Sequence, residues 1–242
     1  MSHPAVLAQS QPVIPEFNRG SDCVRENGTF CWAWFKDNWA GTFQPALLEH
    51  IWLTLLAVSI GFVIAFFAAL LAYRMRWFEG PFTLLTGILY TIPSLALFQL
   101  LVPITGLTTL TVEIALVSYT LLIIFRNTLL GLRGVPEDVR EAARGMGLTP
   151  GQMLMKVELP LALPAIMAGL RVATVTIVSL ATVAAFIVDQ GLGGPIREAI
   201  QKNFNTEFIA AGVLAVALAL VADGILVLVQ RLLTPWARRQ TA

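Results

Sequence analysis

The chain has 242 residues, of which 57% are hydrophobic and 13% are charged, and its mean hydropathy is +0.75. Soluble domains carry about 25% charged residues, so this composition excludes an ordinary water-soluble domain. The formal net charge of +1 gives no indication of a nucleic-acid partner. Long uncharged stretches alternate with short polar ones, which is the pattern that a lipid bilayer requires.

The first 45 residues are polar and lack a basic start followed by a short apolar run, so we predict neither a cleavable signal peptide nor a lipid anchor in the tail 1–45. The two cysteines of the chain, Cys23 and Cys31, both lie in this tail. No CxxC motif or Cys/His cluster accompanies them, which argues against a metal site. They are either two free thiols or a disulfide pair.

Long apolar stretches predict five transmembrane helices, because a helix needs about 20 apolar residues to cross a bilayer. The stretches are Ile51–Tyr73, Pro81–Phe125, Leu159–Val188 and Phe208–Gln230. The second is about twice the length of one crossing, and Pro103, Thr105 and Gly106 provide a turn near its middle, so we expect two spans there. The predicted fold is an all-α polytopic membrane domain over 46–236.

The positions of lysine and arginine predict the orientation, because cytoplasmic loops near span ends are enriched in them. One side holds ten basic residues: Arg74, Arg76, Arg126, Arg133, Arg140, Arg144, Lys156, Arg231, Arg238 and Arg239. The other side holds five: Arg19, Arg25, Lys36, Arg197 and Lys202. We therefore expect the C-terminal tail 237–242 in the cytoplasm and the tail 1–45 outside, in an oxidising space that favours a disulfide between Cys23 and Cys31.

The longest polar segment between spans, 131–159, has the signals of a helical hairpin. Pro136 suits a first helical position, and Glu137 suits the positive end of a helix dipole. Gly145 and Gly147 then end this helix. Its expected apolar face consists of Val139, Ala142, Ala143 and Met146.

A capping box starts the second helix of the hairpin, with Thr149 as the N-cap and Gln152 three residues later. We expect Pro160 to stop this helix before the next span. The apolar face of such a hairpin either folds back on the protein's own spans or binds a partner, and the pattern alone does not choose between the two.

The hairpin also contains a longer signature. Glu141-Ala142-Ala143, then Gly147, then nine residues, then Val157-Glu158-Leu159-Pro160 resembles the EAA motif of ABC-importer permeases, with Val157 in place of the more usual isoleucine. In such permeases this loop is the coupling helix, which docks into a cleft of a cytoplasmic ATPase. The resemblance therefore implies a type I ABC importer permease fold. It also implies that the residues coupled to the ATPase are Glu141, Ala142, Ala143, Gly147, Leu159 and Pro160.

Further segments look like the osmoprotectant branch, which comprises the glycine betaine, choline and carnitine permeases. They are Tyr90–Leu97, Arg126–Thr128 with Gly131 and Leu132, and Gly191–Gly194. The resemblance implies alternating-access import of a small quaternary amine across the bacterial inner membrane. It implies two permease subunits, identical or related, with two ATPase subunits and an extracytoplasmic solute-binding protein. Because the chain has no GxxxxGK[ST] loop, ATP and Mg would be bound by the ATPase, and we expect no cofactor on this chain.

Two positions in the sequence are candidates for the solute path or its gate. Pro93, followed by Ser94, lies inside the second span, where a missing backbone donor kinks or opens the helix; such a break either lines a path or serves packing alone. Asp189 precedes a glycine-rich turn and a short helix ending near Asn203, which is either a gate, a docking surface for a binding protein or a plain solvated loop.

Arg171 and Asp223 are the charged residues within the last two predicted spans. Counted at 1.5 Å per residue from the expected cytoplasmic ends, both lie roughly 15 Å deep. We therefore predict a structural ion pair between them. The alternative is that Asp223 attracts a cationic substrate, although the nearby arginine would cancel its field.

Three competing functions are weighed against this interpretation. The first is an importer of the same architecture for an amino acid or another small solute. The second is an ion-coupled secondary transporter, which would usually show internal repeats. The third is an intramembrane enzyme, but His3 and His50 both lie outside the apolar stretches and no nucleophile with a base is visible, so we expect a transport subunit and not an enzyme.

Overall fold

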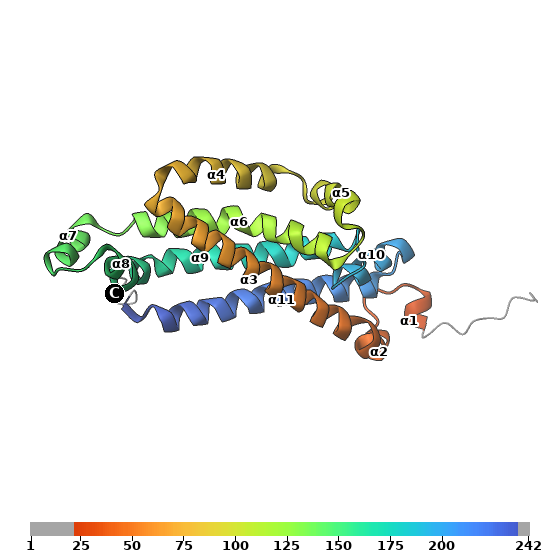
Figure 1. The fold of residues 1–242 in the computed structure, drawn as a ribbon. Coiled ribbons are helices and arrows are strands. Elements are labelled where there is room, and N and C mark those ends of the chain that lie inside the picture. The colour runs from red at the N-terminus through yellow and green to blue at the C-terminus, as the bar shows by residue number, and fades with distance from the viewer. Residues whose placement is uncertain (1–21, 237–242) are drawn as a thin grey trace, which may run out of the picture.

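The computed structural model describes residues 22–236, so the tail 237–242 and the first part of the tail 1–45 lie outside the described residues. Over 22–236 the chain is helical and contains no strand. The long helices run side by side as a bundle (Figure 1): α3 (Gln44–Arg74), α6 (Thr109–Arg133), α9 (Leu159–Ala184) and α11 (Asn205–Leu233). The shorter helices are α1 (Asp22–Arg25), α2 (Trp32–Asn38), η1 (Trp39–Phe43), α4 (Arg76–Thr91), α5 (Ser94–Thr105), α7 (Glu137–Gly145), α8 (Pro150–Met153), η2 (Leu154–Glu158) and α10 (Gly193–Lys202).

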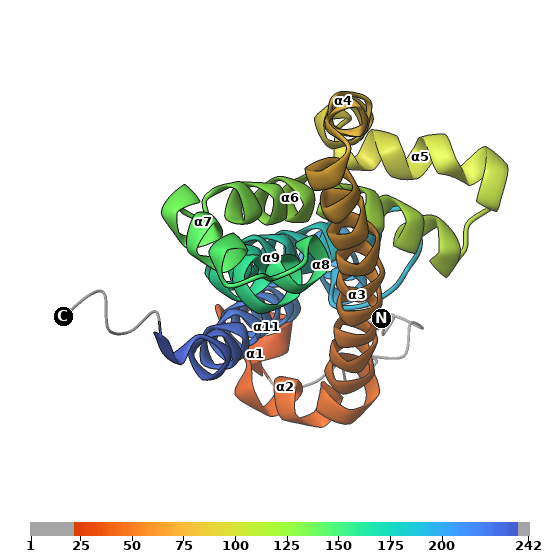
Figure 2. The same cartoon turned by 60° about the vertical axis from the view of Figure 1, so that its left-hand side comes forward.

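The second predicted span is broken. Four helices in the described part of the chain are long and apolar enough to cross a membrane, and α4 with α5 makes a fifth crossing only if the bent pair is counted as one span. The two helices meet at an angle of 102° around Pro93, and Figure 2 shows α5 pointing away from the axis of α4. The expected turn after this span is present, since α5 ends at Thr105 and Gly106 has a φ of 74°.

Glycines let the three central helices approach closely. A Cβ atom on Gly61 of α3 would lie 1.7 Å from Oγ1 of Thr120 on α6, and one on Gly169 of α9 would lie 2.5 Å from Cβ of Asn127 on α6. Small residues at helix contacts are the usual way to pack helices in a bilayer, where lipid tails are as apolar as leucine. The largest buried cluster, which includes Leu116 of α6, lies between these helices.

The hairpin differs from the prediction in two places. Pro136 is the N-cap of α7, with an extended ψ of 142°, and not its first helical residue. The expectation that Pro160 stops the second helix is wrong, because the chain continues from α8 through the π-helical segment η2 into α9. In η2 the Leu159 N–H bonds the carbonyl of Leu154, five residues back. Pro160 falls in the first turn of α9, where its missing N–H does not interrupt the helix.

The segment before α3 is folded from Asp22 onward, and we call Asp22–Phe43 the N-terminal cap. Cys23 and Cys31 form a disulfide, with their Cα atoms 5.8 Å apart. The side chain of Asn27 accepts from the Asn205 N–H at 2.9 Å and donates to the Asn203 carbonyl at 2.7 Å. The cap is thereby fixed to the turn between α10 and α11, at the end of the bundle opposite α7 (Figure 1).

Candidate functional site

The end of α7 is a Schellman motif, in which the helix closes with two backbone hydrogen bonds across a residue of positive φ. The Leu148 N–H donates to the Ala143 carbonyl at 3.2 Å, and the Gly147 N–H donates to the Arg144 carbonyl at 2.9 Å. Gly147 has a φ of 80°, which only glycine adopts without strain. The glycine of the signature therefore sets the sharp turn between α7 and α8.

The predicted apolar face of α7 is divided between the inside and the outside of the molecule. Ala143 is buried, whereas Ala142 is exposed and Met146 is 72% exposed. Glu141 and Gly147 are exposed as well. The hairpin thus buries one alanine and presents the acid, the second alanine, the methionine and the glycine as a small outward surface. Small residues on such a surface allow another chain to approach closely.

A buried polar network joins the hairpin to the membrane helices. Glu158, only 2% exposed, accepts from Nε of Arg140 at 3.0 Å and from the Tyr73 hydroxyl at 2.7 Å. Nη2 of Arg140 donates to the Leu132 carbonyl at 2.8 Å. These contacts connect α7 to the last turn of α3, the end of α6 and the start of α9. One polar network therefore holds the hairpin to the ends of three membrane helices.

Sequence reasoning missed Arg140 and Tyr73 as members of this site. The available signal for Arg140 was its position three residues after Glu137, with which it forms an ion pair at 3.1 Å. Hydrogen bonds from Arg144 and from Arg140 lower the pKa of the Glu137 carboxyl. Nothing local marks Tyr73, because its partner Glu158 lies 85 residues further along the chain.

The second half of the signature serves a different purpose from the first. Leu159 and Pro160 are half-buried in the first turn of α9, and Leu159 packs against the buried Leu132 cluster. Together with Glu158 they anchor the hairpin and offer little open surface. The exposed part of the predicted coupling site is thus confined to the end of α7.

The helix break is stabilised by a tyrosine from the neighbouring helix. The Tyr119 hydroxyl of α6 donates to the carbonyl of Ile92, which lies between α4 and α5. Pro93 is the exposed N-cap of α5 and Ser94 is its first residue, so neither lies within a straight span. The break is therefore a fixed feature of the fold.

The loop after α9 is attached to the first membrane helix. Asp189 is exposed and forms an ion pair with Arg197 of α10, with 2.7 Å between Oδ2 and Nη2. The backbone N–H groups of 191 and 192 donate to the Glu49 carboxylate at 2.8 Å and to Nδ1 of the buried His50 at 3.1 Å. This arrangement shows a loop that is fixed in place, and the short helix that follows ends before Asn203 as expected.

Arg171 and Asp223 come together across α9 and α11. Nε of the arginine lies 2.7 Å from Oδ1, and Nη2 lies 2.9 Å from Oδ2. Both side chains are about one-third exposed in the single chain, at 33% and 32%. The two-point contact leaves Asp223 with its charge matched, which disfavours the alternative that it attracts a cationic solute.

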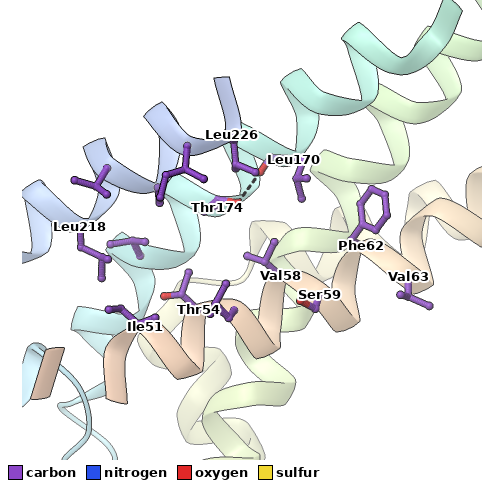
Figure 3. Close-up of a pocket in the computed structure, with 15 residues that line it drawn as sticks. Ile51, Thr54, Val58, Ser59, Phe62, Val63, Leu170, Thr174, Leu218 and Leu226 are labelled. Carbon is purple, nitrogen blue, oxygen red and sulfur yellow. Dashed lines mark hydrogen bonds between the residues drawn. The ribbon is translucent and has the colours of Figure 1, made fainter. Parts of the chain in front are cut away.

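An apolar cavity of about 580 Å³ lies between α3, α9 and α11 (Figure 3). Its few polar lining side chains are those of Thr54, Ser59 and Thr174. The Thr174 hydroxyl is already used, since it donates to the Leu170 carbonyl at 2.8 Å (dashed in Figure 3). A cavity with this lining suits hydrocarbon and offers no charge to a polar solute.

The chain matches a protein family over most of its length. The model of the binding-protein-dependent transport system inner membrane component matches residues 39–239. The chain belongs to this family. As a member of it, the chain is a multi-pass permease subunit of a binding-protein-dependent ABC importer, which works with an ATPase and a solute-binding protein. The cap up to Asn38 precedes the matched residues.

Relatives of this permease carry names that agree with one another. It is 38% identical to the choline transport system permease protein OpuBB of Bacillus subtilis (strain 168), over 77% of this chain and 86% of the relative. It is 36% identical to the osmoprotectant import permease protein OsmW of Salmonella typhimurium (strain LT2), over 81% and 94%. It is 36% identical to the carnitine transport permease protein OpuCB of Listeria monocytogenes, over 79% and 88%.

A solved structure has the same fold. A chain of the MetNI methionine ABC transporter, in an inward-facing conformation, superposes on the permease with a TM-score of 0.69 at 23% identity. The match covers 79% of this chain and 95% of that one. The likeness confirms the predicted type I importer fold.

Proposed function

We propose that this permease moves a small osmoprotectant, a quaternary amine such as glycine betaine, choline or carnitine, across the bacterial inner membrane. The agreement among the relatives' names, at 33–38% identity over most of the chain, is the observation that carries the substrate class. Two permease subunits, identical or related, assemble with two ATPase subunits that bind ATP and Mg, and an extracytoplasmic binding protein delivers the solute.

The end of α7 is the contact with the ATPase. Its exposed surface of Glu141, Ala142 and Gly147 is small enough to enter a cleft, and the buried Glu158 with Arg140 ties it to the membrane helices. Closure of the ATPase dimer on binding ATP moves α7, and the network carries that movement into α3, α6 and α9. The spans then reopen outward to accept solute, and hydrolysis resets them.

The N-terminus lies outside and the C-terminus lies in the cytoplasm. The excess of arginine and lysine near α7 supports this orientation, as does a disulfide at the opposite end of the bundle. Pro93, Ser94 and the loop at Asp189 then lie towards the outer half of the membrane, where they form part of the path or its gate.

Uptake measurements test the docking assignment. We combine Gly147→Ala with Glu141→Lys, because alanine at a φ of 80° strains the turn and lysine reverses a surface charge. The complete importer, with its own ATPase and binding protein, is assayed for uptake of radiolabelled glycine betaine, choline and carnitine. We expect the variant to lose about tenfold in uptake and to release the ATPase during purification.

Gly80→Ala is the matched control. Gly80 lies in α4, is exposed, and has nothing within 4 Å of an added Cβ, as is also true of Gly147, but its φ is not positive. This variant should retain both uptake and the ATPase. Full activity and full ATPase retention in the Gly147→Ala, Glu141→Lys variant would contradict the docking assignment. Absence of uptake of all three solutes by the unaltered importer would contradict the substrate class.

A further inference from the structure

An aromatic pair lies at the break between α4 and α5. The ring of Tyr90, in the last turn of α4, meets the ring of Tyr119 edge to face, with centroids 5.8 Å apart. Tyr119 is 5% exposed and is fixed by its hydrogen bond to the Ile92 carbonyl. Tyr90 is 40% exposed, so part of its ring is open. A buried tyrosine thus supports an exposed one beside the bend between α4 and α5.

The local groups at the break decide which charge it favours. Helix α4 ends here with the negative end of its dipole, and α5 begins at Ser94 with the positive end of its own, so the two dipoles oppose each other. The carbonyl of Leu89 lacks its usual donor four residues on, because Pro93 has no N–H. Between Glu79 and Arg126 the one charged side chain in the sequence is that of Glu113, so α4 after Glu79 and all of α5 bring no cation of their own to this position.

The break has to face protein or water in the assembled importer. Irregular backbone at membrane depth is tolerated where it is buried in protein or lines a water-filled cavity, since lipid satisfies no polar group. Tyr90 and Pro93 are exposed in the single chain, so residues 22–236 leave this side of the break uncovered. The apolar cavity between α3, α9 and α11 contains neither residue. The break is therefore the better place for a charged solute.

We propose that the Tyr90 ring contacts the quaternary ammonium group of the solute during translocation and contributes to selectivity. The inference rests on the proposed function, which supplies the substrate class. A quaternary ammonium group has no N–H to donate, and its charge is spread over methyl groups, so an aromatic face suits it better than a hydrogen-bond acceptor does. The binding protein captures the solute first, so Tyr90 acts on the rate of passage and not on capture.

The test compares side chains at position 90 in the complete importer. Tyr90→Phe and Tyr90→Trp keep an aromatic face and should transport within about twofold of the original, whereas Tyr90→Leu and Tyr90→Met should lower the maximal uptake rate about 5- to 30-fold. The KM should stay unchanged in all four. Trp77→Leu is the matched control, because Trp77 is an aromatic residue of the same helix, 70% exposed, far from the break, and should show no effect.

A second measurement separates contact with the solute from a folding defect. We compare uptake of glycine betaine with that of dimethylglycine, which carries an N–H and one methyl group fewer. In Tyr90→Leu and Tyr90→Met the ratio of the two rates should fall relative to the original importer. An equal loss for both solutes, or aliphatic variants that match the original, would overturn the assignment of Tyr90. Absence of glycine betaine, choline and carnitine uptake by the original importer would instead overturn the proposed substrate class.

Discussion

At the scale of single residues, Glu158 is the centre of the connection between hairpin and membrane helices. It is 3% exposed at the side chain, whereas its partner Arg140 is 15% exposed. Glu158→Ala removes the acceptor of both Arg140 and the Tyr73 hydroxyl, whereas Arg140 keeps its ion pair with Glu137 and its hydrogen bond to the Leu132 carbonyl. The variant should therefore lower the free energy of unfolding in detergent by about 2–3 kcal/mol, the cost of losing hydrogen bonds to a buried charged group. Thermal unfolding measures it.

Tyr73→Phe is the graded comparison for Glu158→Ala. It removes one hydrogen bond of 2.7 Å and leaves the ion pair of Glu158 with Arg140 in place. Its cost should be about 1 kcal/mol. Equal stability of the two variants would show that the network does not act as a buried charge pair.

At the scale of helices, the ion pair of Arg171 with Asp223 holds α9 against α11. In the most apolar 18-residue stretch of α11, only 6% of the residues are buried by the described part of the chain. The ion pair is therefore an important attachment for this helix. Arg171→Asp or Asp223→Arg alone places two like charges together and should reduce the amount of permease in the membrane several-fold. The charge-swapped double variant should restore it, as measured by immunoblot of membranes. A double variant no better than either single one would count against the pairing.

Sequence patterns predicted individual elements well and their junctions poorly. The capping box of Thr149 with Gln152 is present as expected, with both reciprocal hydrogen bonds, because it is encoded within four residues. Pro160 was misjudged because the rule that proline stops a helix ignores a preceding π turn. The attachment of Asn27 to Asn203 was beyond prediction, since the two lie 176 residues apart and neither has a local signal.

At the scale of the whole molecule, the N-terminal cap and the hairpin occupy opposite ends of the bundle (Figure 1). Labelling of thiols at each end from one side of the membrane therefore measures the orientation of the permease. With the cap outside, Cys23 and Cys31 should not react with a membrane-impermeant maleimide in intact spheroplasts while they form the disulfide. After an impermeant reductant opens the disulfide, both should be labelled.

For the opposite end, Gly151→Cys in a Cys23→Ser, Cys31→Ser background adds a thiol to the exposed start of α8, where nothing lies within 4 Å of an added Cβ. That thiol should be labelled only after permeabilisation. Labelling of Gly151→Cys in intact spheroplasts would reverse the orientation and would place α7 out of reach of a cytoplasmic ATPase.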